Sequence, residues 1–211
     1  MQSLLDVPSD PVALLVLAHG AGAPMTHASM AGIAESLVAR RIAVFRFNFP
    51  FMEAGKRRVD SRAVATRSIS EAVGAARAKH PELPMYLGGH SFGGRMASHA
   101  VLDHDLSVIR GLVFCSFPLH PAKKPSTDRA EHLRDIEVPM LFVSGTRDGL
   151  AEPGLLSATV DALGSRAQLH WLDTADHGYK VLKRSRKSEV PVFEELSGYV
   201  SDFAKAHRNQ P

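Results

Sequence analysis

The feature of this sequence that most limits its possible folds is a series of six short apolar runs separated by segments with helical spacing. Several runs are nearly continuous in Val, Leu, Ile and Phe, as in strands that helices cover on both faces. Strands that alternate with helices predict right-handed crossovers and a parallel sheet. We therefore predict an α/β fold, a three-layer α/β/α sandwich with a mostly parallel sheet of about six strands. The predicted strands are 12–18, 42–48, 85–88, 111–116, 140–144 and 167–172.

Length and composition define the broad class of protein. A chain of 211 residues is long enough for one domain with a full core, so we assign residues 1–211 to a single domain. Hydrophobic residues make up 45% and charged residues 22% of the chain, which excludes a disordered or fibrous protein. A net charge of +3 requires no basic face, and no apolar run approaches the ~20 residues that span a bilayer. We expect neither a nucleic-acid nor a membrane partner.

Cysteine usage and the first residues bear on location. Cys115 is the only cysteine, which excludes an intrachain disulfide and fits a reducing compartment. The opening residues include Asp6 and Asp10 and lack the basic region of a secretory signal. We expect a soluble, cytoplasmic protein, and the sequence leaves its oligomeric state open.

The segment 85–95 carries the strongest chemical signal. An apolar run leads into Gly89-His90-Ser91-Phe92-Gly93, and helical spacing follows. A Gly-x-Ser-x-Gly turn between a strand and a helix lifts the serine oxygen above the sheet edge, and its tight geometry requires small flanking residues. The N-terminus of the following helix favours negative charge at the serine. We predict that Ser91 is a nucleophile.

A nucleophilic serine requires a base and an acid, which this kind of fold supplies in the chain order Ser, Asp/Glu, His. His177 lies in a loop directly after the last predicted strand, where a base facing Ser91 would emerge. Asp148 follows the penultimate strand, where a carboxylate can orient the imidazole. Asp173 and Asp176 are closer to His177 in the sequence and remain alternative acids.

Acyl transfer also requires hydrogen-bond donors for the oxyanion of the tetrahedral intermediate. The N–H of Phe92, directly after the serine, is one predicted donor. The turn after the first long run, 17–23, contains small residues that allow close backbone approach. Within it we predict the Ala21 N–H as the second donor, with Gly22 as the alternative, and we expect His19 to fix the loop.

Together these motifs resemble the α/β-hydrolase superfamily, in particular its small dienelactone-hydrolase-like members, over most of the chain. This resemblance implies a serine hydrolase that cleaves an ester or related acyl bond, with a small-molecule substrate and no metal or organic cofactor. Dienelactone hydrolases resemble this chain but use a cysteine nucleophile, so their lactone substrate is not carried over. The motifs are His19-Gly20-Ala21-Gly22, Gly89-His90-Ser91-Phe92-Gly93-Gly94-Arg95, Gly145-Thr146-Arg147-Asp148 and Asp176-His177-Gly178.

The segment 118–137 is too short for a cap domain and has room for one short helix around 129–134. The predicted site is therefore open, and it suits a small ester better than a long-chain lipid.

After the second run, Phe49, Phe51 and Met52 form either an apolar wall of the site or ordinary core. The basic segments 56–58 and 180–187 either face solvent or contact an acidic substrate or a partner.

Other function classes receive less support. The glycine-rich segments 20–25 and 88–95 fail the dinucleotide and phosphate-loop patterns at their last positions, and no zinc-binding motif is present. The alternative to a serine hydrolase is a non-catalytic scaffold or binding protein with a hydrolase fold. Hydrogen-bond contact among Ser91, His177 and Asp148 separates the two hypotheses.

Overall fold

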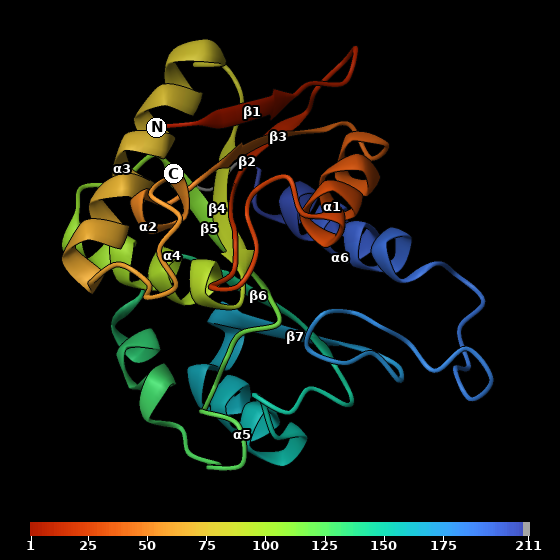
Figure 1. The fold of residues 1–211 in the computed structure, drawn as a ribbon. Helices are drawn as coiled ribbons and strands as arrows, with labels where there is room; N and C mark the ends of the chain where they lie inside the picture. The colour runs from red at the N-terminus through yellow and green to blue at the C-terminus, as the bar shows by residue number, and fades with distance from the viewer. Residues whose placement is uncertain (209–211) are drawn as a thin grey trace.

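In the computed structural model, which describes residues 1–208, one seven-stranded sheet forms the centre of the molecule (Figure 1). The strand order is β1-β3-β2-β4-β5-β6-β7, and all neighbours are parallel except β1 and β3. This arrangement confirms the predicted α/β class. The strands are β1 (Ser3–Asp6), β2 (Ala13–Ala18), β3 (Ile42–Phe47), β4 (Met85–His90), β5 (Ile109–Cys115), β6 (Met140–Gly145) and β7 (Ala167–Leu172).

The sequence analysis missed β1, the antiparallel edge strand. It has four residues with no fully buried position, so it lacks the apolar run that identifies the other strands. Its place is fixed by tertiary contacts instead. Arg46 of β3 donates to the Asp6 carboxylate at 2.7 Å, and Asn48 donates from its backbone to the Gln2 carbonyl at 3.0 Å.

Helices cover both faces of the sheet and give the three layers. Helices α3, α4 and α5 pack on one face with the larger core cluster, while α1 and α6 pack on the other face with the smaller cluster (Figure 1). The helices are α1 (Ala28–Val38), α2 (Pro50–Glu53), α3 (Arg62–Lys79), α4 (Phe92–Asp103), α5 (Pro153–Leu163) and α6 (Val192–Ala206), with 3₁₀ helices η1 (Asp128–Asp135) and η2 (Gly164–Arg166).

The segment between β5 and β6 bears on access to the sheet edge. Its only helix is η1, in the place where a short helix was predicted, and no cap domain covers the sheet in the described part of the chain. Among residues 1–208, no helix is long and apolar enough to cross a membrane.

Because the strands are parallel and in register, the carboxyl ends of β2, β4, β6 and β7 lie at the same edge of the sheet. Ala18 of β2 pairs with Gly89 of β4, and Gly145 of β6 pairs with Leu172 of β7. Loops that follow the carboxyl ends of parallel strands therefore meet there, which is where ligands bind in open α/β sheets. Every predicted site residue belongs to one of these loops or to the start of α4.

Candidate active site

The turn between β4 and α4 holds Ser91 in a strained conformation. Its φ of 52° lies in the left-handed region, and its N–H donates to the Cys115 carbonyl at 3.0 Å. A Cβ at either Gly89 or Gly93 would lie 2.5 Å from the Ala18 carbonyl oxygen, so only glycine fits at these two positions. The predicted sharp turn is thus present, with the serine side chain above the edge of the sheet.

Ser91, His177 and Asp148 form a continuous hydrogen-bonded chain. Ser91 Oγ lies 2.8 Å from His177 Nε2, and His177 Nδ1 lies 2.8 and 2.9 Å from the two Asp148 oxygens. The carboxylate accepts from Nδ1–H, which leaves Nε2 as the acceptor for the serine hydrogen. The Asp148 side chain is completely buried and also accepts from the Leu150 N–H at 2.8 Å.

The two alternative acids have other partners. Asp173 accepts from the Lys187 N–H at 2.8 Å. Asp176 accepts from the N–H groups of Gly178 and Lys180, both at 2.9 Å, and so closes the turn that carries His177. Both carboxylates bind backbone groups of their own loop, and Asp148 is the acid that contacts the imidazole.

The predicted oxyanion loop is fixed by His19, which is fully buried. His19 Nε2 accepts from the Phe49 N–H at 3.0 Å, so Nδ1 carries the hydrogen and donates to the Gly20 carbonyl at 2.7 Å. Burial lowers the pKa of His19 and keeps the ring neutral. In a trans peptide the N–H points opposite to the C=O. The Ala21 N–H therefore points away from His19, and Ala21 lines the same pocket as Ser91.

Phe92 begins α4 directly after the serine, so its N–H belongs to the helix N-terminus. Its ring lies in the core, with ring centroids 5.4 Å from Phe49 and 6.0 Å from Phe51. Phe49 and Phe51 are fully buried and are not among the residues that line the pocket. These two phenylalanines are core residues that brace the start of α4, which decides against their role as a wall of the site.

His90, which the sequence analysis passed over, also belongs to the site. Its Nε2 donates to the His177 carbonyl at 2.8 Å, and the two imidazole centroids lie 5.2 Å apart. Burial lowers the pKa of His90 to about 4, so the ring is neutral near pH 7. The sequence signal that could have identified His90 as a site residue was its position directly before Ser91, at the end of a strand. The contact with residue 177 could not be read from sequence because it crosses 87 positions.

The pocket above Ser91 has a volume of about 620 Å³. The loop after β2 and the start of α1 contribute small or apolar residues together with His27 and Ser29, whereas the loops after β6 and β7 contribute Arg147 and Lys180. Segment 56–58 is exposed and lies outside this lining. The lining residues are Gly20, Ala21, Gly22, Ala23, His27, Ser29, Met30, His90, Ser91, Arg147, Gly149, Leu150, Asp176, His177, Gly178 and Lys180.

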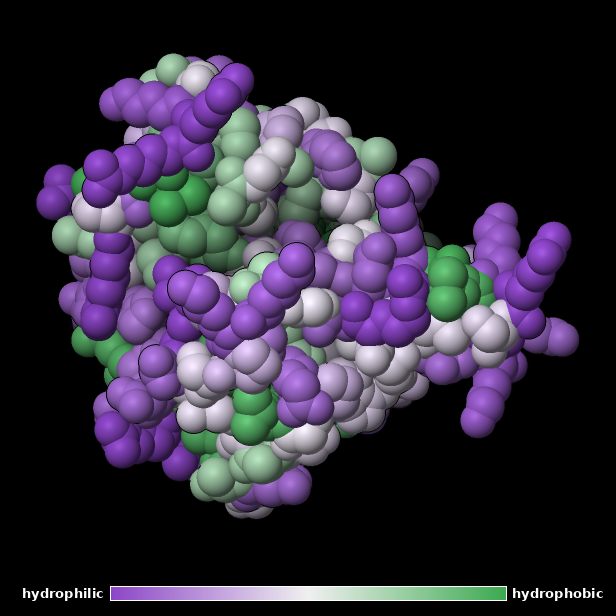
Figure 2. Space-filling view, turned by 60° about the horizontal axis from the view of Figure 1, so that its bottom comes forward, coloured by the Kyte–Doolittle hydropathy of each residue, from purple (hydrophilic) through white to green (hydrophobic). Residues whose placement is uncertain are grey.

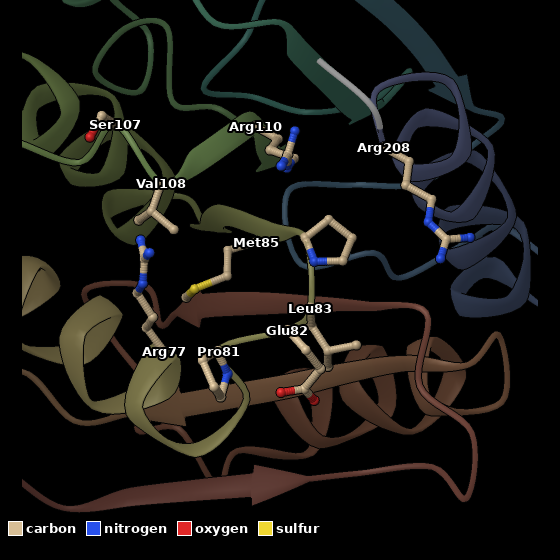
Figure 3. A pocket seen from close by; sticks show the side chains of 10 residues that line it. Arg77, Pro81, Glu82, Leu83, Met85, Ser107, Val108, Arg110 and Arg208 are labelled. Atoms are coloured by element: carbon tan, nitrogen blue, oxygen red, sulfur yellow. The ribbon is translucent and has the colours of Figure 1, made fainter. Parts of the chain in front are cut away.

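A second pocket, of about 480 Å³, lies at the opposite edge of the sheet (Figure 3). It is rich in arginine, with Arg77, Arg110 and Arg208 around Met85. Its lining includes Ser107 and one carboxylate, Glu82, but no histidine or cysteine. Within residues 1–208, no group of three or more His, Cys, Asp or Glu side chains could hold a metal ion.

The fold and the gathered polar groups define a class of protein. A family model described as an alpha/beta hydrolase domain matches residues 11–205. The chain therefore belongs to the alpha/beta-hydrolase family, as the sequence motifs predicted.

Solved structures with low sequence identity share the fold. Est1E from Butyrivibrio proteoclasticus, in a complex with ferulic acid, is 16% identical, with a TM-score of 0.73 and coverage of 99% of this chain and 96% of that chain. Dienelactone hydrolase from Anabaena variabilis is 16% identical, with a TM-score of 0.73 and coverage of 98% and 92%. XC6422 from Xanthomonas campestris, a serine hydrolase without a lid, is 18% identical, with a TM-score of 0.69 and coverage of 99% and 90%.

Proposed function

We propose that this protein is a serine hydrolase that cleaves an ester or thioester bond of a small molecule through an acyl-enzyme intermediate. The observation that carries the proposal is the unbroken chain of hydrogen bonds from Ser91 through His177 to Asp148, with every link between 2.8 and 2.9 Å. This arrangement has the geometry of an activated nucleophile, because a base contacts the hydroxyl and a third group orients the base.

In the first half of the reaction, Ser91 Oγ attacks the substrate carbonyl carbon while its proton moves to His177 Nε2. Asp148 stabilises the imidazolium that forms. The oxyanion accepts hydrogen bonds from the N–H groups of Phe92 and Ala21. When the tetrahedral intermediate collapses, the bond to the leaving oxygen or sulfur breaks. His177 then gives its proton to the leaving atom, and an alcohol or thiol departs.

In the second half, a water molecule attacks the carbonyl carbon of the acyl-enzyme and gives a proton to His177 Nε2. Collapse of this second intermediate breaks the bond between the acyl carbon and Ser91 Oγ, and the serine recovers its hydrogen from His177. The products are one carboxylic acid and one alcohol or thiol. This cycle uses only groups of this chain and water.

The open pocket supports a small substrate, as does the ferulic acid in the complex with Est1E, a protein of the same fold. A purely structural role would not explain the strained backbone at Ser91 or the buried carboxylate that contacts His177. Strained backbone of this kind is concentrated at functional sites. Cytoplasmic location and independence from nucleic acid and membranes remain predictions of the sequence.

The test is intact mass after exposure to a fluorophosphonate probe, which phosphonylates an activated serine. We expect one adduct on the wild type and none on Ser91→Ala or His177→Ala, with far-UV circular dichroism to show that the variants fold. A folded wild type without an adduct would overturn the proposal. A positive result leads to a screen of matched esters and thioesters, which decides between those two leaving atoms.

A further inference from the structure

We propose that the leaving half of the substrate, its alcohol or thiol, carries an anionic group that Arg147 and Lys180 bind. This inference rests on the hydrolase function proposed above and adds a substrate class to it. The observations that carry it are the unequal charges of the two pocket walls and the side of the pocket on which His177 delivers its proton.

The charged wall is built around the His177 loop. Arg147 directly precedes the catalytic carboxylate. Its backbone N–H donates to the Ala175 carbonyl at 2.9 Å, and its guanidinium donates to the Thr174 carbonyl at 3.1 Å. These bonds hold both the backbone and the guanidinium of Arg147 against the loop and still leave several of the five guanidinium donors for a ligand. A guanidinium held in this way can bind a planar or tetrahedral anion through two donors.

Lys180 lies on the same wall, three residues after His177. The turn that carries it is rigid, because Tyr179 is buried and its hydroxyl donates to the Val143 carbonyl at 2.9 Å. The turn is also closed by Asp176, whose carboxylate accepts from the Lys180 N–H. The backbone of Lys180 is thus fixed at the rim of the pocket, while its long side chain can reach inward.

The net charge of this wall is positive. Arg147 and Lys180 supply two cations, and Asp176 is the only other charged residue in the pocket lining, apart from the imidazoles. Asp176 already accepts two backbone N–H groups. In the described part of the chain, no carboxylate lies within ion-pair distance of Arg147 or Lys180. An anionic group on the substrate would balance them.

The opposite wall has a different character. It is formed by the oxyanion loop and the start of α1, and its side chains are Ala21, Ala23 and Met30 together with the polar His27 and Ser29. These groups suit an uncharged part of the substrate. His27, at the N-cap of α1, is the one titratable group on this wall.

The direction of proton transfer assigns the two walls to the two halves of the substrate. His177 Nε2 must lie within hydrogen-bond reach of the leaving atom, because it returns the proton to that atom. The leaving half therefore lies over the His177 loop, beside Arg147 and Lys180. The acyl half then faces the uncharged wall. An anion on the leaving half binds both cations, whereas an anion on the acyl half does not.

The basic residues further along the chain do not share this role. The segment between β7 and α6 projects from the body of the molecule, at the right of Figure 1 and Figure 2, and carries mostly hydrophilic side chains with a few exposed apolar ones. Of the cations in 180–187, only Lys180 lines the pocket. Lys183 is exposed on the projecting segment and serves as a matched control.

The experiment compares acetates of phenols that differ in one meta substituent. The probes are phenyl acetate, 3-acetoxybenzoate, 3-acetoxyphenylphosphonate and the cationic 3-(trimethylammoniomethyl)phenyl acetate. For each probe, kcat/KM is divided by the rate constant for hydroxide hydrolysis, which removes differences in intrinsic reactivity. Phenyl hydrogen adipate, in which the carboxylate is on the acyl half, tests the assignment of the walls.

We expect the wild type to prefer the anionic leaving groups over phenyl acetate by about tenfold or more, since a charged hydrogen bond contributes about that factor. The cationic probe should be disfavoured, and added salt should reduce the preference. The ratio of anionic to neutral kcat/KM should fall towards one in Arg147→Gln with Lys180→Gln. It should keep its wild-type value in Lys183→Gln. The larger of the carboxylate and phosphonate ratios identifies the preferred anion.

Three results would overturn the inference while leaving the hydrolase function intact. These are a wild-type ratio near one, a preference that survives in the Arg147→Gln and Lys180→Gln double variant, and a preference for phenyl hydrogen adipate instead. Failure to hydrolyse any of the esters, together with no fluorophosphonate adduct, would overturn the proposed function itself. Arg147→Lys, which keeps the positive charge, should retain part of the preference.

Discussion

Helix α4 is associated with two serine–histidine pairs, and only one of them is arranged for chemistry. At the start of the helix, Ser91 Oγ lies 2.8 Å from His177 Nε2. Two turns further along, Ser98 Oγ lies 2.7 Å from His132 Nε2. By the distance between oxygen and nitrogen the two pairs are equivalent. They differ in the direction of the hydrogen bond and in the charge behind the imidazole.

The direction of each serine–histidine hydrogen bond follows from the other hydrogen-bond partners of the serine and the histidine. Ser98 uses its only hydrogen to donate to the Arg95 carbonyl at 2.7 Å, so His132 Nε2 must donate to Ser98. His132 then has no lone pair on that nitrogen to remove a proton from the serine. At Ser91 the direction is reversed, because the Asp148 carboxylate accepts from His177 Nδ1 and leaves Nε2 free to accept.

The charges around the two imidazoles also differ. A buried carboxylate, that of Asp148, lies behind His177 and accepts a hydrogen bond from its Nδ1. His132 instead stacks on His99, with ring centroids 3.7 Å apart. Burial, followed by the charges of Arg62 and Arg95, lowers the pKa of His132 to about 4. A short serine–histidine distance therefore does not define a catalytic site. The orienting carboxylate is what separates the proposed site from the second pair.

Replacement of the two serines should give the largest difference between the pairs. We expect Ser91→Ala to lower kcat by about 10⁴-fold or more, since it removes the nucleophile. Ser98→Ala should change kcat less than about twofold. Ester hydrolysis measured on both folded variants checks this prediction. Equal losses in the two variants would contradict the assignment of Ser91 as the nucleophile.

The orienting carboxylate is tested by Asp148→Asn. The amide keeps the size of the side chain and can still accept from the Leu150 N–H, but it cannot favour the imidazolium of His177. We expect kcat to fall by about 10³- to 10⁴-fold. Asp176→Asn is the matched control, a carboxylate in the turn that carries His177, and should change kcat by less than about fivefold. A larger loss in the control would instead favour Asp176 as the acid.

His90 is expected to act as a positioning residue through the backbone of His177. His90→Phe keeps a ring but removes the donor to the His177 carbonyl, so we expect kcat to fall by about tenfold because small displacements of a base are costly. His90→Gln can still donate and should recover part of the loss, with KM nearly unchanged in both variants. Equal kcat values in the phenylalanine and glutamine variants would show that this hydrogen bond does not position the base.

The smallest effect concerns stability at the second pair. Burial lowers the pKa of both His99 and His132 to about 4, against 6.5 in the unfolded chain. Between these two values the unfolded state binds more protons, so the free energy of unfolding falls as the pH drops from about 6.5 to about 4. We expect Tm to decrease by several degrees between pH 7 and pH 5. In His132→Gln this decrease should be smaller, and thermal melts at both pH values would reveal an unchanged slope if the interpretation is wrong.

The sequence alone determined the class of fold and predicted the three residues that the structure joins by hydrogen bonds, Ser91, His177 and Asp148. Apolar runs of strand length define β2 to β6 because strands buried on both faces need continuous apolar side chains, and β7, a half-buried edge strand, shows a weaker form of the same pattern. Ser91 was found because its turn requires glycine at positions 89 and 93. His177 and Asp148 were found because they directly follow strands whose carboxyl ends meet at one edge. These signals are local in the chain, so they can be read without a structure.

The tertiary structure decided what depends on contacts between distant segments. It added β1, whose four residues are held by β3 and not by their own apolar pattern. It separated Asp148 from Asp173 and Asp176, since only hydrogen-bond geometry shows which carboxylate faces the imidazole. It placed Arg147 and Lys180 on one wall of the pocket. Side-chain direction and long-range packing fix these features, and neither is encoded in the spacing of residues along the chain.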